Sequence, residues 1–213
     1  MKLLLPLAVI LLFASISCAQ TNDANRNKGT IGGPCEGCEA IYESPTPFEK
    51  LDWFVKLPDW GGKGIKLGIN GIVYKADGKT PAANVIIYVY HTNQQGIYPT
   101  KGDEKDWAKR HGYIRGWMKT NEKGEYKFMT LRPGSYPNSK IPAHIHVFIK
   151  EPGKNEYWID EFVFNDDPFL TTAERANHKG RGGVGVLKTI EVEKDFQKAT
   201  RDIILGKEIP GYR

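Results

Sequence analysis

Two histidines stand two residues apart in the segment Pro142-Ala-His-Ile-His-Val-Phe-Ile149. The segment is otherwise apolar and predicts a β-strand. Successive strand side chains point to opposite faces, so His144 and His146 share one face while Ile145 points to the other. Two imidazoles on one face supply half of a metal site. A pair of half-exposed strand histidines, or of histidines bonded to backbone carbonyls, has the same spacing, so the motif alone leaves both interpretations open.

The remaining ligands decide which metal such a pair would bind. No histidine is followed two residues later by Asp or Glu, as the usual pattern of an Fe(II) oxygenase requires, and three cysteines are too few for a thiolate site. Tyrosines are available instead, at Tyr98 in Gln95-Gly-Ile-Tyr-Pro99 and at Tyr136 in Pro133-Gly-Ser-Tyr-Pro137. Either tyrosine taken singly could be a packing residue at a strand end.

A phenol has an ordinary pKa near 10, so a tyrosinate at neutral pH needs a strongly charged Lewis acid beside it. Ferric iron meets that demand better than zinc does. The sequence therefore predicts one Fe(III) per chain, held by the following residues: Tyr98, Tyr136, His144 and His146.

The elements that must position these residues are strands at short, regular spacing, which predicts an all-β sandwich of mainly antiparallel strands with long functional loops. Turn signals such as Asp77-Gly and Asn121-Glu-Lys-Gly124 separate them. A glycine-rich stretch, 165–185, is too long for a plain connector and contains one possible short helix at 171–178. The expected strands are 66–74, 84–91, 113–120, 125–130, 143–150, 157–164 and 187–193.

The N-terminal end predicts export. Residues 1–19 have the layout of a signal peptide, and their apolar run falls short of the roughly 20 residues of a membrane span. Either ordinary cleavage follows, or Cys18 becomes the lipidated first residue of a membrane-anchored lipoprotein. The expected location is therefore periplasmic, membrane-anchored or extracellular.

After the leader, residues 20–34 are polar and predict a flexible tether, and residues 35–213 predict a single domain. Cys35 and Cys38 are expected to form a small structural disulfide, because no second cysteine pair completes a zinc ribbon. The net charge of +5 is spread among carboxylates without a basic run, so no nucleic-acid partner is expected.

Further motifs extend the pattern along most of the chain after residue 65. In chain order they are Gly71-Ile-Val, Asp77-Gly, Pro81-Ala-Ala-Asn-Val, Tyr90-His91, Gly96-Ile-Tyr98, Arg115-Gly116, Thr120-Asn-Glu-Lys-Gly-Glu-Tyr126-Lys-Phe128, Pro133-Gly-Ser-Tyr136 and Pro142-Ala-His-Ile-His146. This ordered series resembles the intradiol ring-cleavage dioxygenases that act on protocatechuate and catechol. Several of the glycine and turn motifs also occur in transthyretin-like and carboxypeptidase-regulatory sandwiches, but those modules lack the His-x-His pair and the two tyrosines.

The resemblance implies that the ring of a catechol-type substrate opens with O2 between its two hydroxylated carbons, giving a muconate-type diacid. It also implies that Tyr98 and His144 are in-plane ligands, that Tyr136 and His146 are axial, and that Tyr136 is the catalytic ligand that leaves when substrate binds. Relatives in the family often assemble, so a homo-oligomer is expected.

One position departs from the family pattern. The family usually has an Arg three residues before the first strand histidine, and this chain has Ile141 there. Arg175, Lys179 or Arg181 could supply the missing charge from another loop. Two other functions remain open at this point: a non-catalytic exported binding module of the transthyretin-like or carboxypeptidase-regulatory-like kind, and a surface protein that stores or senses iron.

Overall fold

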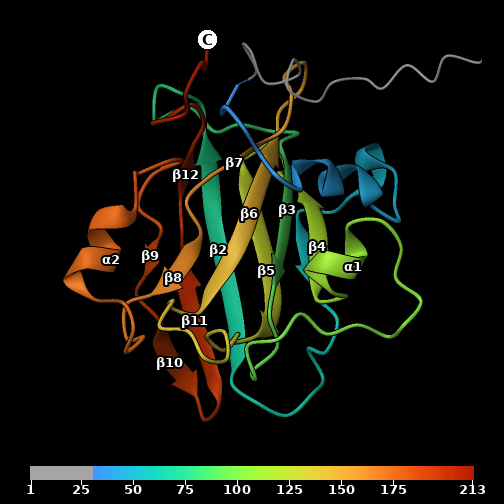
Figure 1. Cartoon of the computed structure of the whole chain (residues 1–213). Helices are drawn as coiled ribbons and strands as arrows, with labels where there is room; N and C mark the ends of the chain where they lie inside the picture. Colours follow the sequence, from blue (N-terminus) through green and yellow to red (C-terminus); the bar gives the residue numbers. More distant parts are fainter. Residues whose placement is uncertain (1–30) are drawn as a thin grey trace, which may run out of the picture.

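The computed structural model describes residues 31–213. Two sheets face one another, and most of the helical turns lie at the margins (Figure 1). The predicted leader at 1–19, with Cys18, and most of the predicted tether lie outside the described residues. Ile31 and Gly32 already pack against the domain, since the Gly32 amide donates to the carbonyl of Pro210 over 2.7 Å. None of the helices within 31–213 has the length and apolar character needed to cross a bilayer.

The first sheet is built on one long antiparallel pair. β2 pairs with β5 over seven residues of β2, from Lys66 opposite Leu131 to Ile72 opposite Glu125. β1 runs parallel to β5, and β11 and β12 run parallel to β2, whereas the edge strand β10 runs antiparallel to β11. In order across the sheet the strands are β1 (Phe54–Lys56), β5 (Glu125–Leu131), β2 (Lys66–Tyr74), β11 (Phe196–Thr200) and β10 (Ile190–Glu193), with β12 (Ile203–Ile204) also paired with β2.

The second sheet carries the predicted histidine pair. Its centre is β6, which pairs antiparallel with β3 so that Tyr90 lies opposite His146. In order the strands are β4 (Arg115–Lys119), β3 (Ile86–His91), β6 (His144–Lys150), β8 (Phe162–Phe164) and β9 (Val186–Leu187), with β7 (Tyr157–Trp158) also paired with β6. The all-β sandwich predicted from the sequence is confirmed, with both sheets mixed rather than purely antiparallel.

The core lies between the two sheets and is filled by alternate strand residues. Ile69 and Phe128 of the first sheet and Ile145 and Val147 of the second are almost completely buried in it. Because strand side chains alternate, the residues of β6 on either side of Ile145 face outward. The histidine pair therefore lies on the outer face of the second sheet.

That outer face is covered by an N-terminal segment and by loops. The 3-10 helix η2 (Cys38–Glu43) packs there in a second apolar cluster with Tyr88, Trp117 and Phe148, and the Trp117 indole donates to the carbonyl of Ile41 over 2.8 Å. A disulfide joins Cys35 to Cys38 at the start of this helix, as predicted. The remaining helical turns are η3 (Phe48–Lys50), α1 (Ala108–His111) and α2 (Thr172–Asn177).

Two of the predicted strands are interrupted. The segment 157–164 divides into β7 and β8, because the chain between them leaves the ladder at Asp160 and Glu161. The segment 187–193 divides between the sheets, with its first residue in β9 and its last four in β10.

Candidate metal centre

The four side chains predicted to bind iron converge on one point. The phenol oxygens of Tyr98 and Tyr136 lie 2.5 Å apart, and the Tyr98 oxygen lies 2.9 Å from Nε2 of His146. The Tyr136 oxygen lies 3.1 Å from Nε2 of His144, and the two Nε2 atoms are 3.2 Å from each other. Two oxygen and two nitrogen donors thus face a common centre.

The two tyrosines reach this centre from loops that follow strands of different sheets. Tyr98 follows β3 and Tyr136 follows β5. The loops are tied together by the Gly134 amide, which donates to the carbonyl of Asn93 over 2.9 Å, and by the Thr92 hydroxyl, which donates to the carbonyl of Gly134 over 2.8 Å. Backbone contacts therefore fix the separation of the phenols.

Each histidine is oriented through its other ring nitrogen. Nδ1 of His144 lies 2.7 Å from the carbonyl oxygen of Pro142; a carbonyl only accepts, so Nδ1 carries the proton and Nε2 presents its lone pair. Nδ1 of His146 lies 3.6 Å from a carboxylate oxygen of Glu161. The ring of Tyr90 stacks on that of His146 with centroids 4.5 Å apart. Such outer contacts are the usual supports of metal-bound imidazoles.

Burial shifts the pKa values of the side chains at the centre. Burial lowers the pKa of His144 to about 4, so its imidazole is neutral at pH 7, as a metal ligand must be. Burial, together with the hydrogen bond to Tyr136, raises the pKa of Tyr98, and burial also raises the pKa of Tyr136. Although burial acts to raise it, the hydrogen bond and charge of His146 hold the pKa of Glu161 down at about 2.

This donor set suits a hard trivalent cation. Donor atoms bound to one metal at about 2 Å are about 3 Å from one another, close to the separations found here. Two buried phenols ionise only if a strong positive charge replaces the proton between them. Within residues 31–213, His, Cys, Asp and Glu side chains by themselves form no group of three that could hold a metal ion, so the tyrosines are needed to complete a ligand set.

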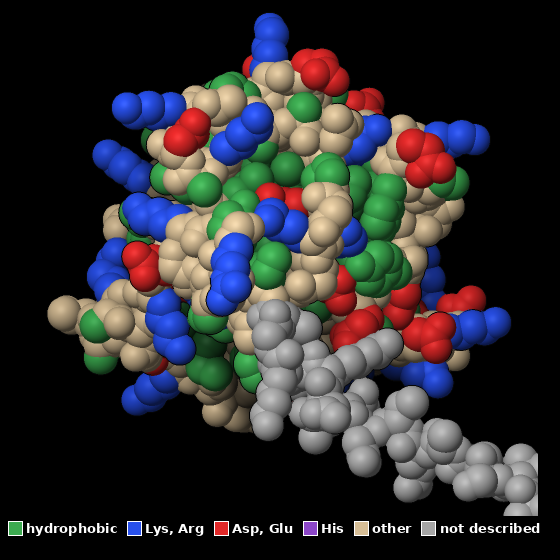
Figure 2. Space-filling view, turned by 90° about the horizontal axis from the view of Figure 1, so that it is seen from above, with side chains coloured by type: hydrophobic (Ala, Val, Ile, Leu, Met, Phe, Trp, Pro, Cys, Tyr) green, Lys and Arg blue, Asp and Glu red, His purple; other side chains and the backbone are tan. Residues whose placement is uncertain are grey.

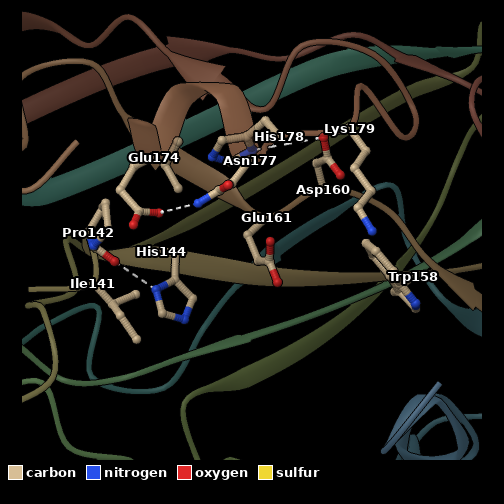
Figure 3. Close-up of a pocket in the computed structure, with 11 residues that line it drawn as sticks. Ile141, Pro142, His144, Trp158, Asp160, Glu161, Glu174, Asn177, His178 and Lys179 are labelled. Atoms are coloured by element: carbon tan, nitrogen blue, oxygen red, sulfur yellow. Dashed lines mark hydrogen bonds and ion pairs between the residues drawn. The ribbon is translucent and has the colours of Figure 1, made fainter. Parts of the chain in front are cut away.

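A cavity of about 250 Å³ opens beside His144, bordered by Ile141, Trp158, Glu161 and the α2 segment (Figure 3). Of the three cations considered as substitutes for the family arginine, only Lys179 borders it. Arg181 is buried, with its guanidinium 3.3 Å from the ring centroid of Trp158 and bonded to the carbonyls of Gly32 and Trp158. Arg175 bonds to the Asn165 carbonyl instead.

Two residues of the site were not anticipated. Glu161 and Tyr90 both support His146, one through a carboxylate oxygen 3.6 Å from Nδ1 and one through ring stacking. For Glu161 the available signal was a pair of adjacent carboxylates, Asp160 and Glu161, inside an otherwise apolar segment, Tyr157 to Phe164. The role of Tyr90 depends on the strand register that sets it opposite His146.

Comparison with known proteins shows which family the chain resembles. A family model described as Dioxygenase matches residues 42–205. The chain is 29% identical over 113 residues to the protocatechuate 3,4-dioxygenase beta chain of Burkholderia cepacia, covering 50% of this chain and 48% of that protein. It is 27% identical over 166 residues to catechol 1,2-dioxygenase 2 of Acinetobacter lwoffii, covering 70% of this chain and 58% of that protein. The chain thus spans about half the length of these curated relatives.

The fold is shared with solved structures of the same kind. The dioxygenase domain of a dioxygenase carbohydrate-binding protein fusion from Streptomyces sp. SirexAA-E superposes with a TM-score of 0.55 at 20% identity, covering 76% of this chain and 94% of that one. Because the family model covers most of the chain, from η2 to β12, the protein belongs to the intradiol ring-cleavage dioxygenase family.

Proposed function

We propose that this protein is a non-haem Fe(III) dioxygenase that opens catechol-type rings between the two hydroxylated carbons. The observation that carries the proposal is the convergence of Tyr98, Tyr136, His144 and His146 on one centre. In the reaction, both atoms of O2 enter the product and the bond between the two hydroxylated carbons breaks. Each of these carbons becomes a carboxyl carbon of a muconate-type diacid, and the two former phenol protons stay on its carboxyl groups or pass to solvent.

When bound, a ferric ion supplies the Lewis acidity that makes a deprotonated catechol reactive toward O2. The protein contributes the rest. His144 and His146 keep their Nε2 lone pairs directed at the centre, because their Nδ1 atoms are engaged by Pro142 and Glu161. The Tyr98 oxygen contacts Tyr136 and His146, and its ring packs against the second apolar cluster, so this phenol is held in place at the centre.

Tyr136 is suited to take a proton from the substrate. Its hydroxyl contacts Tyr98 and His144, it sits on a loop rather than a strand, and its side chain is half-buried. A phenolate at that oxygen accepts one substrate proton at Oη and turns away, leaving room for the catechol oxygen. The second catechol proton passes to solvent.

The test is oxygen consumption by iron-loaded protein with a panel of catechol, substituted catechols and hydroxyquinol. We expect one O2 consumed per ring opened, with a muconate-type diacid as product. Iron binding without O2 uptake would point to storage or sensing of iron, and neither iron binding nor O2 uptake would point to a binding module.

We also propose that the chain is exported and that its leader ends near Cys18. The Cys35–Cys38 disulfide supports this, because disulfides persist in oxidising compartments. Expression of the full chain with labelled palmitate distinguishes the two processing routes: label lost on Cys18→Ala indicates a lipoprotein, whereas an unlabelled, shortened and released protein indicates ordinary cleavage. An unprocessed protein retained in the cytoplasm would contradict export.

A further inference from the structure

Two cavities flank Glu161 on the side of the sheet that carries the donor set. One, of about 250 Å³, borders His144, and the other, of about 210 Å³, borders His146. Both have Trp158 and Glu161 in their walls. Because each cavity borders one histidine of the donor set, ring substituents of a substrate bound there can enter space shaped by these side chains.

The walls of the two cavities carry more carboxylates than cationic side chains. Among the described residues that border the two cavities there is one lysine, Lys179, and no arginine. The carboxylates are more numerous: Glu36, Asp160, Glu161 and Glu174. Elsewhere on the molecule, Lys and Arg side chains are common and stand among carboxylates around the margin of the face in Figure 2. The walls thus differ in charge balance from the chain as a whole, whose net charge is +5.

Three of these carboxylates are already engaged within the protein. Asp160 accepts from the Gly180 amide over 2.7 Å and lies 3.9 Å from His178, Glu36 pairs with Arg110, and Glu161 lies 3.6 Å from Nδ1 of His146. Glu174 has a much weaker engagement, since its side chain contacts only the Asn177 amide, over 3.4 Å.

The placement of the charged side chains makes the cavity most negative near His144. In Figure 3 the carboxylate of Glu174 lies above His144, while that of Glu161 lies farther to the right in the view. A Glu161 carboxylate oxygen is 3.6 Å from Nδ1 of His146. Lys179 extends toward Trp158 at the far side. Ile141, at the position where the family pattern has arginine, contributes an uncharged wall beside His144.

We infer that this pocket selects catechols whose ring substituent carries a positive charge, such as an amine, over catechols that carry a carboxylate. The inference rests on the proposed function and names its substrate class. Beside Glu161 and Glu174 a substrate carboxylate would have to lose water without a cation to pair with, because Lys179 lies at the far side of the cavity. An ammonium group in the same place donates charge-assisted hydrogen bonds to the Glu174 carboxylate.

The experiment uses three probes of similar size that differ in charge: 4-(aminomethyl)catechol, 4-methylcatechol and 3,4-dihydroxybenzoate. For iron-loaded protein we expect kcat/KM for the amine to exceed that for the carboxylate by at least tenfold, with 4-methylcatechol between them. The dissociation constants measured without O2 are expected to follow the same order, which separates recognition from turnover. A ratio of amine to carboxylate near or below one, in kcat/KM and in binding, overturns the inference.

Substitutions assign the effect to the pocket. Glu174→Gln removes one charge without changing shape and is expected to lower the amine-to-carboxylate ratio at least threefold, while Lys179→Gln is expected to raise it. Glu122→Gln, in an exposed turn away from the site, removes the same charge and should leave the ratio unchanged. An equal change in Glu122→Gln and Glu174→Gln would show that only the net charge matters and would overturn the assignment.

The same measurements separate failure of the inference from failure of the proposed function. If 4-methylcatechol is opened but the carboxylated probe is preferred, the enzyme stands and the substrate class is wrong. If none of the three probes drives O2 uptake while iron is bound, the proposed function itself fails.

Discussion

The phenol oxygens of Tyr98 and Tyr136 lie 2.5 Å apart, although the residues are 38 positions apart and follow strands of different sheets. At that separation the two hydroxyls share one hydrogen bond and leave little space for a second proton. Each phenol also faces an imidazole nitrogen. Burial keeps both phenols neutral in the metal-free protein, and they ionise when a cation replaces their protons.

Tyr136→Phe tests this relationship through colour. Iron-loaded wild-type protein is expected to absorb visible light because tyrosinate donates charge to ferric iron, and the variant should show a weaker and shifted band. Because the variant also loses the group that accepts a substrate proton, we expect turnover to fall by about 100-fold. Tyr42→Phe is the control, since Tyr42 bonds to Glu156 on the surface. An unchanged spectrum in Tyr136→Phe would exclude Tyr136 as a ligand.

His144→Ala tests the nitrogen half of the site. Disturbing a residue that merely supports a metal ligand costs about 10–100-fold in affinity, so removal of a ligand should cost at least as much. We expect iron per chain, measured after dialysis by atomic absorption, to fall at least tenfold. His178→Gln is the matched control, because His178 borders the same cavity but pairs with Asp160. Full iron content in His144→Ala would show that the pair is structural.

The histidine pair could be predicted because it depends on local pattern, and Tyr98 and Tyr136 because their loop motifs fit the family series. The alternation of β6 sets His144 and His146 on one face irrespective of the rest of the fold. β2 also runs over the predicted residues 66–74, and α2 lies within the predicted helix at 171–178, because turn and capping signals border both. The Thr171 hydroxyl, for example, accepts from the Glu174 amide at the start of α2.

The residues that hold the metal ligands in place could not be predicted, because their positions depend on strand pairing. Tyr90 reaches His146 only through the register of β3 against β6, and a shift of one residue would turn it to the core. Tertiary pairing also creates β1, three residues long, which forms by lying parallel to β5. Strands this short carry no periodic signal of their own.

His91 gives the metal-free protein a pH dependence. Its Nδ1 donates to the Thr92 carbonyl, its Nε2 accepts from the Thr130 hydroxyl, and burial lowers its pKa to about 4 from the ordinary 6.5. Between these values the unfolded chain binds a proton that the folded chain does not. The free energy of unfolding should therefore decrease as pH falls from 6.5 to 4, by roughly 1 kcal/mol per pH unit for this residue.

Urea denaturation of iron-free protein at pH 7, 6 and 5 measures how the free energy of unfolding changes with pH, which is the slope compared below. His91→Gln can keep both hydrogen bonds without titrating, so its slope should be smaller. A residual slope is expected, because burial also lowers the pKa of His111 to about 3 and of His144 to about 4. Identical slopes in the variant and the wild type would show that His91 is already protonated or already exposed.

Gly96 holds the two tyrosine loops at their close approach. Its φ is +75°, and a Cβ added there would lie 1.8 Å from the carbonyl oxygen of Ser135, the residue before Tyr136. Gly96→Ala must therefore push one loop away from the other and separate the phenols. We expect weaker iron binding and a weaker visible band, together with a loss of stability of about 1–3 kcal/mol.

Gly153→Ala is the control that isolates the steric effect. Gly153 has nearly the same φ, +72°, but an added Cβ would have no atom within 4 Å. Both variants carry the backbone strain of an alanine at positive φ, so both should unfold more easily, but only Gly96→Ala should lose iron affinity. Equal iron affinity in the two variants would mean that the loops can part without moving the phenols, and that the strands rather than the loop contact set the geometry of the centre.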